Sequence, residues 1–245
     1  YILDFDDAIF LKYKEKSSTK NKIIRLVKNS SLCTAGNSFL AKKLINFGGK
    51  NVQIFPTVVD IIKYKPKANN DIVTIGWIGT NSTIFYLNKI IHIINKLSEH
   101  KEFKLISIGA KVNEKLIGES LNYSFYEWSE DCEVDLLNKI DIGIMPLHNS
   151  EWEKGKCSYK LIQYMALEKA VVASKIGSNL DLINSKDIGY LCNTDEEWYS
   201  CLKILIDNKQ LRTNIGKAAR KRIKSHYSLQ KWIRVYNNNL HKCFQ

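Results

Sequence analysis

The stretch DIGIMPLHNSEWEKGKCSYKLIQYMALEKAVVAS covers residues 141–174 and holds the pattern that decides the fold. It opens with an apolar run at 141–145 that ends before a proline, and it closes with a second apolar run at 170–173. Between them, residues 157–168 carry apolar side chains at helical spacing. Two short strands joined by a helix are typical of parallel strands with a crossover connection, so the stretch predicts an α/β protein.

The same alternation extends in both directions from this stretch. It predicts one complete doubly wound, Rossmann-like parallel sheet, preceded by the last part of a second sheet. A polar stretch at 61–70 is expected to link the two. The expected strands are 2–5, 31–34, 52–55, 72–78, 103–108, 123–128, 141–145, 170–173 and 188–191, and the expected helices are 21–29, 37–47, 83–97, 132–139, 157–168, 195–207, 211–225 and 228–240.

Composition excludes several classes of protein. The 245 residues are 44% hydrophobic and 25% charged, which is typical of a soluble globular chain and argues against a disordered or fibrous one. The sequence contains no apolar run long enough for a membrane span and no signal peptide pattern. Its cysteines and histidines lack metal-ligand or redox spacing, so we expect a cytosolic protein with reduced thiols and no metal or other cofactor. Because the chain opens directly on a strand-like run without Met, we expect it to be a piece of a longer protein.

The net charge of +12 is unevenly distributed. Residues 1–70 carry +8 and residues 211–245 carry +9, whereas residues 71–210 carry −5. Basic segments favour an anionic membrane surface, nucleic acid or a phosphorylated substrate, although a lysine-rich composition also serves solubility alone. The sequence shows no RNA-binding, zinc-finger or basic-zipper signature, so nucleic acid is not an expected partner.

Two glycine-containing turns follow expected strands and can hold an anion there. In the first, GWIGTNS at 76–82, Gly79 lets the backbone approach a phosphate, and Thr80, Asn81 and Ser82 add hydroxyl or amide donors. The alternative for this run is an ordinary tight turn.

The second turn opens the run GKCSYKLIQYMA at 155–166. If a helix begins near Lys156, Lys160 and Gln163 follow it at i+4 and i+7 on one face. Two ammonium groups near a helix N-terminus suit a diphosphate, and the Gln163 amide can bond ribose hydroxyls. The alternative is an amphipathic helix with a solvated lysine face.

Taken in order, these runs resemble the donor-binding signature of the group-1 retaining glycosyltransferases of the GT-B fold. The turn at 76–79 resembles the first glycine turn of their C-terminal domain. The resemblance extends over nearly all of the chain. Further segments that carry it are 141–147, Trp152, 155–156, 160–166 and 171–174 in that domain, and DFDDA (4–8), GN (36–37) with Leu40 and PTVVD (56–60) at the end of the N-terminal domain and the hinge.

The resemblance implies a domain division and a set of donor-binding residues. Residues 1–60 would be the remnant of the acceptor-side domain, 61–227 the nucleotide-sugar-binding domain, and 228–245 a helix that crosses back to the first domain. Lys160 would face the diphosphate and Gln163 the ribose. The other implied positions are Gly155, Lys156 and Cys157 near the phosphates and transferred sugar, Gly79, Thr80, Asn81 and Ser82 on the phosphate side, and Trp128 and Ser129 near the base.

The sequence departs from the family at its paired carboxylates. The family pattern is commonly a Glu, seven residues and a second Glu, but Gly155 and Gln163 stand at these positions. Glu151 and Glu153 lie close by and are candidates, with Lys156, for the catalytic group, which the sequence leaves unidentified. The acidic run at 4–7 is interpreted as capping and hinge-side hydrogen bonding, with a phosphatase nucleophile pair or a metal site as the alternatives.

These observations predict a glycosyltransferase fragment that moves a sugar from a nucleotide sugar to a saccharide or lipid-linked acceptor with retention, in surface polysaccharide or lipopolysaccharide assembly. We expect a cytoplasmic enzyme whose basic segments face an anionic membrane on the inner side of the cell. Two alternatives stay open: a GT-B-fold nucleotide-sugar epimerase and a non-catalytic nucleotide-binding module.

Overall fold

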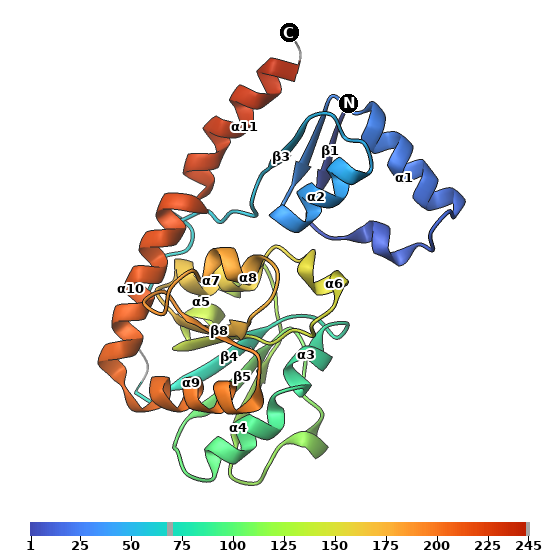
Figure 1. Ribbon diagram of the computed structural model, residues 1–245. Coiled ribbons are helices and arrows are strands. Elements are labelled where there is room, and N and C mark those ends of the chain that lie inside the picture. Colours follow the sequence, from blue (N-terminus) through green and yellow to red (C-terminus); the bar gives the residue numbers. More distant parts are fainter. Residues whose placement is uncertain (68–70, 244–245) are drawn as a thin grey trace.

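The computed structural model describes residues 1–67 and 71–243, with only the backbone for 242–243. Each of its two α/β units is built on a parallel sheet (Figure 1). The N-terminal unit has the strand order β1-β2-β3, and the C-terminal unit has the order β6-β5-β4-β7-β8-β9. The six-stranded order is that of a doubly wound sheet. All its strands are parallel, and the order in which successive strands are added reverses between β4 and β7. The predicted fold class is therefore confirmed.

The boundaries of the elements agree with most of the expected ones to within a few residues. Residues 68–70 of the expected linker lie outside the described residues. The strands are β1 (Ile2–Phe5), β2 (Leu32–Ala35), β3 (Val52–Ile54), β4 (Thr74–Ile78), β5 (Lys104–Ile108), β6 (Asn122–Tyr126), β7 (Ile142–Met145), β8 (Ala170–Ser174) and β9 (Tyr190–Cys192). The α-helices are α1 (Ser18–Asn29), α2 (Ser38–Asn46), α3 (Ile84–Asn88), α4 (Ile91–Ser98), α5 (Glu133–Asn138), α6 (Glu151–Lys154), α7 (Tyr159–Ala166), α8 (Ser178–Leu182), α9 (Asp195–Asp207), α10 (Lys209–His226) and α11 (Leu229–Cys243).

The burial of the central strands of the C-terminal unit explains why apolar runs in the sequence predict the fold. Every residue of β4, β7 and β8 is buried, because helices cover both faces of the sheet. Two apolar clusters, one on each face, hold the helices against it. The predicted start of α2 is also confirmed, since the Asn37 side chain accepts the Leu40 N–H at 2.9 Å.

The helix expected over residues 83–97 is wrong as a single element. The structure divides it into α3 and α4 at a tight turn, where the Ile90 N–H bonds to the Leu87 carbonyl at 3.1 Å. Ile90, Ile91, Ile93 and Ile94 are all buried. The turn sets α4 apart from α3, and α4 by itself buries Ile91, Ile93, Ile94 and Leu97 in one apolar cluster.

The segment before α7 also differs from expectation. Residues 147–156, expected as a loop, contain the short helix α6, which is capped by Ser150. The helix expected from 157 begins only at Tyr159, because Ser158 is left-handed with φ 58° and its hydroxyl donates to Asn179 in α8 at 2.6 Å. Lys156 therefore lies before the helix, not in its first turn.

The hinge between the units pairs with the segment between α10 and α11. Val59 forms an isolated parallel bridge with Ser228, and its N–H donates to the Tyr227 carbonyl at 3.0 Å. Beyond this point α11 runs beside the N-terminal unit (Figure 1), where the rings of Phe55 and Trp232 are 5.5 Å apart. Among the described residues, no helix combines the length and apolar character that crossing a bilayer requires.

Candidate active site

The turn after β4 brings backbone, an aromatic ring and a lysine together. The Gly79 N–H donates to the Ile108 carbonyl at 2.9 Å, which fixes the turn on the neighbouring strand. A Cβ added at Gly79 would overlap the Trp77 ring and lie 2.7 Å from Lys160 Nζ. A side chain at this position would therefore collide with Trp77, and the expected approach of the Gly79 backbone to a phosphate stays a prediction.

Lys160, in the first turn of α7, is a half-buried lysine. Its Nζ lies 4.4 Å from the centroid of the Trp77 ring. Burial, and secondarily the charge of Lys156, lowers the pKa of Lys160 from 10.5 to about 7. Within the described part of the chain, no carboxylate forms an ion pair with it. A desolvated cation without a partner is costly, and an anionic ligand would relieve that cost.

Tyr164, one turn further along α7, holds the end of β4 in place. Its ring is fully buried, and its hydroxyl oxygen accepts the Ile78 N–H at 2.9 Å. The ring fits against Gly143 of β7, where a Cβ would overlap it. Tyr164 thus sets the distance between α7 and the Gly79 turn.

Replacing Tyr164 with Phe is expected to lower the free energy of unfolding by about 1–3 kcal/mol, because the buried Ile78 N–H loses this acceptor. Urea unfolding of the two proteins measures the difference. The matched control is Tyr13→Phe, since Tyr13 is 41% exposed. Equal effects of the two substitutions would show that the Ile78 bond is not what Tyr164 contributes.

A cavity of about 420 Å³, here called the interunit cavity, lies between the two units. Lys156, Cys157 and Lys160 line it from the C-terminal unit, and Asp6 and Asp7 line it from the N-terminal unit. Lys156 Nζ is 4.0 Å from an Asp7 carboxylate oxygen. Burial raises the pKa of Asp7, and Lys156 partly offsets the rise. The cavity therefore offers cations on one wall and carboxylates on the other.

A second cavity, of about 600 Å³, lies on the other side of Gly79 and is here called the turn cavity. Gly79, Thr80, Asn81 and Trp128 all line it. Trp128 is 52% exposed, and its indole N–H donates to Glu133 at 2.8 Å. Gly79 and Lys160 thus lie between a cavity with an exposed aromatic ring and a cavity with two lysines.

Four of the expected donor-binding residues lie outside both cavity linings: Ser82, Ser129, Gly155 and Gln163. The Ser82 hydroxyl pairs with that of Thr80 at 2.8 Å, and the Ser129 hydroxyl donates to Cys132 at 3.0 Å. Their contact with a donor stays a prediction.

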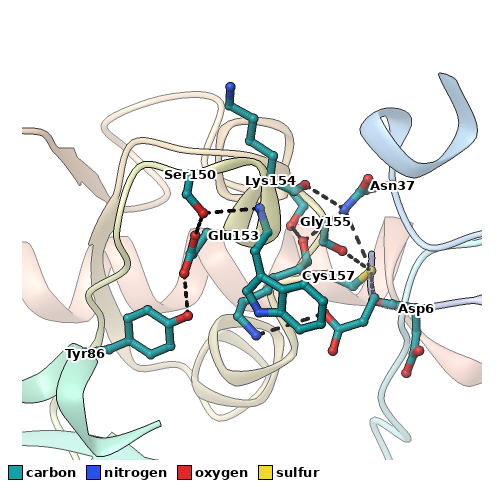
Figure 2. Close-up of polar contacts among 12 residues, drawn as sticks. Asp6, Asn37, Tyr86, Ser150, Glu153, Lys154, Gly155 and Cys157 are labelled. Atoms are coloured by element: carbon teal, nitrogen blue, oxygen red, sulfur yellow. Dashed lines mark hydrogen bonds and ion pairs between the residues drawn. The ribbon is translucent and has the colours of Figure 1, made fainter. Parts of the chain in front are cut away.

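Residues of the N-terminal unit form hydrogen bonds with the segment that precedes α7 (Figure 2). The Asn37 amide donates to the carbonyls of Lys154 and Lys156 at 3.2 and 3.0 Å. The Cys157 thiol donates to the Asp6 carbonyl at 2.9 Å, and burial raises the pKa of that thiol to about 12. These bonds fix the wall of the interunit cavity across the domain boundary.

The two candidate carboxylates lie away from both cavities. Glu151 pairs with Lys43 at 3.2 Å on the surface. Glu153 is buried and accepts hydrogen bonds from Tyr86, at 2.6 Å, and from Ser150 (Figure 2). Burial acts to raise the pKa of Glu153, but these hydrogen bonds outweigh it and leave the pKa below its ordinary value. A catalytic role for either carboxylate stays an untested prediction.

Gln163 is 2% exposed and belongs to a buried chain of hydrogen bonds. Its amide donates to the Tyr64 hydroxyl at 2.9 Å, and Tyr64 in turn donates to Glu133. Because Glu133 also accepts from Trp128, the chain connects Gln163 to the turn cavity. Sequence reasoning missed Tyr64 and Glu133, which are 69 residues apart and give no common pattern. The expected contact of Gln163 with ribose is not tested by this geometry.

The fold is that of the GT-B glycosyltransferases, to judge from solved structures of similar shape. A glycosyltransferase from Rickettsia africae ESF-5 matches with a TM-score of 0.78 at 16% identity, over 100% of this chain and 70% of its own. HepE from Anabaena, solved with UDP and glucose, matches with a TM-score of 0.77 at 16% identity, over 98% of this chain and 71% of its own. Sucrose-phosphate synthase from Thermosynechococcus elongatus matches with a TM-score of 0.74 at 12% identity, over 99% and 67%.

The family follows from the sequence. The family described as Glycosyl transferases group 1 matches residues 69–208, which is more than half of the chain. The comparison of this chain with curated protein sequences found no match. The chain therefore belongs to the group 1 glycosyl transferases, and its enzyme class is that of a transferase.

Proposed function

We propose that the chain binds a nucleoside diphosphate sugar across Gly79 and transfers the sugar, with retention, to a saccharide or lipid-linked acceptor. The observation that carries this proposal is Lys160, which is half-buried beside the Gly79 turn and has no carboxylate partner among the described residues. The base and ribose would occupy the turn cavity, the diphosphate would contact Lys160, and the sugar would enter the interunit cavity. Uridine nucleotides are the first candidates, because HepE has been solved with UDP and UDP-glucose.

The residues suit catalysis by positioning and charge stabilisation. Lys160 and Lys156 are placed to stabilise the negative charge that develops on the departing diphosphate. That diphosphate can itself take the proton of the incoming hydroxyl, so retention needs no protein nucleophile. The walls of the interunit cavity would hold donor sugar and acceptor hydroxyl in contact.

The pathway and cellular site are part of the same proposal. Surface polysaccharide or lipopolysaccharide assembly would present an acceptor at the inner face of the membrane. The basic N-terminal segment and α11 lie on the same part of the molecule (Figure 1), which would suit an anionic lipid surface. Of the nine basic residues in 211–245, α11 carries three, and the other six lie on α10 beside the C-terminal unit.

A thermal-melt series with UDP, GDP, ADP and CMP, with and without magnesium, tests the proposal. A ligand present at about 100 times its dissociation constant adds about 2.7 kcal/mol to the stability of the folded state. We expect one nucleoside diphosphate to raise the melting temperature without magnesium. The absence of a shift with every nucleotide would contradict donor binding by this chain.

A non-catalytic nucleotide-binding module is the second candidate, since neither Glu151 nor Glu153 lines the interunit cavity or the turn cavity. Release of free sugar from the donor, or its transfer, separates the two functions. Binding without either reaction would favour the module.

The lowered pKa of Lys160 predicts proton uptake when the nucleotide binds. Above pH 7 the free lysine is mostly neutral, and a bound diphosphate raises its pKa, so binding takes up a proton. Affinity should therefore fall as pH rises above 7, by up to about tenfold per pH unit. Calorimetry at pH 8 in buffers of different ionisation enthalpy measures the uptake.

Lys160→Arg is the matched control, because guanidinium stays protonated. It should retain nucleotide binding but lose both the buffer-dependent heat and the pH dependence. Buffer-independent heat in the unaltered protein would show that Lys160 is already charged before binding.

A further inference from the structure

A third cavity, of about 490 Å³, lies between the N-terminal unit, the hinge and α11, and is here called the hinge cavity. Its walls include the ends of β1 and β2 and one face of α11. Asp6 and Thr57 line both this cavity and the interunit cavity. The two cavities are therefore adjacent, with Asp6 between them.

Three aromatic rings form one wall of the hinge cavity. The Phe55 ring centroid is 5.5 Å from that of Trp232 and 5.5 Å from that of Tyr236. The Trp232 indole N–H donates to the His226 carbonyl at 2.6 Å, which fixes the ring, and Tyr236 is 41% exposed. An anchored, partly exposed aromatic surface offers contact area for the apolar face of a sugar ring at low entropic cost.

The charged groups that line the hinge cavity are all acidic, although the protein carries a net charge of +12. Asp4 and Asp6 line it, and none of its lining residues is Lys, Arg or His. Thr34 donates to the Asp4 carboxylate, whereas Asp6 has no side-chain partner among the described residues. Carboxylates accept hydrogen bonds from hydroxyl and ammonium groups and repel anions.

We propose that the hinge cavity binds the acceptor and that this acceptor is an uncharged saccharide or an amino sugar, not a phosphorylated or uronic acid sugar. The proposal rests on the function proposed above. The acceptor ring would lie against Trp232 and Tyr236, with a hydroxyl bonded to Asp6 and directed into the interunit cavity. The charges of the two cavities would thus direct each substrate to its own site: the anionic donor would contact Lys156 and Lys160, and the acceptor would contact Asp4 and Asp6.

Saccharide titrations of the full chain, with and without UDP, test this assignment. The probes are maltose, chitobiose and glucosamine, with glucuronic acid and glucose 6-phosphate as anionic counterparts, followed by saturation-transfer NMR and tryptophan fluorescence. We expect millimolar binding of uncharged or amino sugars. Tyr236→Ala and Trp232→Ala should weaken it about tenfold, which corresponds to the loss of one aromatic contact.

Tyr13→Ala is the matched control, since Tyr13 and Tyr236 are both 41% exposed and only Tyr236 lines the cavity. It should leave saccharide binding unchanged, and Asp4→Asn should improve binding of glucuronic acid. Failure of every saccharide to bind, equal binding of the anionic sugars, or full affinity in both α11 variants would overturn the proposal. If saccharides bind as expected while UDP does not, the donor proposal fails and the hinge cavity stands as a saccharide site.

Discussion

Replacing Lys160 with Met is expected to weaken nucleoside diphosphate binding by about 1.5–3 kcal/mol, or roughly tenfold to a hundredfold. Met keeps most of the length and apolar volume of the lysine side chain but removes the charge beside Gly79. Because that charge is half-buried over the Trp77 ring, solvent screens its attraction for a phosphate less than it would at an exposed lysine. Isothermal titration with UDP at pH 7 measures the loss.

The control for this substitution is Lys203→Met on the exposed surface of α9, which should leave affinity unchanged. Stability provides a second readout. The pKa of Lys160 is about 7 in the folded protein, below its ordinary 10.5, so its charge opposes folding most strongly below pH 7 and this effect fades as pH rises toward 10.5. Lys160→Met should therefore raise the melting temperature most at low pH. A variant that binds UDP at full strength would refute the site assignment.

The sequence predicted that Lys160 lies near the start of a helix, as it does in α7, but it could not describe the surroundings of Gln163. Apolar periodicity predicted α7 and its buried face, because such spacing reports burial against the sheet. The i+4 and i+7 argument assumed that the helix includes Lys156. Instead, left-handed Ser158 delays the helix, and its bond to Asn179 is a tertiary contact that local sequence does not encode.

The role of the acidic run at 4–7 was also only partly predictable from the sequence. The sequence favours capping and hinge-side hydrogen bonding for this run, but the residue that bonds Asp4 is Thr34 of β2, which is not part of the hinge. Asp6 and Asp7, however, also form a wall of the interunit cavity opposite Lys156 and Lys160. These carboxylates and lysines lie about 150 residues apart and meet only when the two units dock. The residues that each unit contributes to such a cavity can be recognised in the sequence. That they face each other across one cavity depends on how the two units are arranged.

Gly155 stands where the family commonly has the first of its paired glutamates, and the structure gives a steric reason for the glycine. Its backbone is ordinary, with φ −77° and ψ −11°, so conformation does not demand glycine. A Cβ at this position would lie 2.5 Å from the Cβ of Ala8 and 3.0 Å from its nitrogen. The N-terminal unit therefore occupies the space that a side chain would need.

Restoring the family residue by Gly155→Glu is accordingly expected to lower stability by about 1–3 kcal/mol without improving donor binding, because the added atoms force the two units apart. Gly155→Ala, which adds only the Cβ, should produce much of the same loss. Combining it with Ala8→Gly removes one of the clashing atoms, and the double-mutant cycle should show a favourable coupling of about 0.5–3 kcal/mol in urea unfolding. If Gly155→Ala is as stable as the unaltered protein and the cycle is additive, then Ala8 does not exclude a side chain at this position, and the glycine needs another explanation.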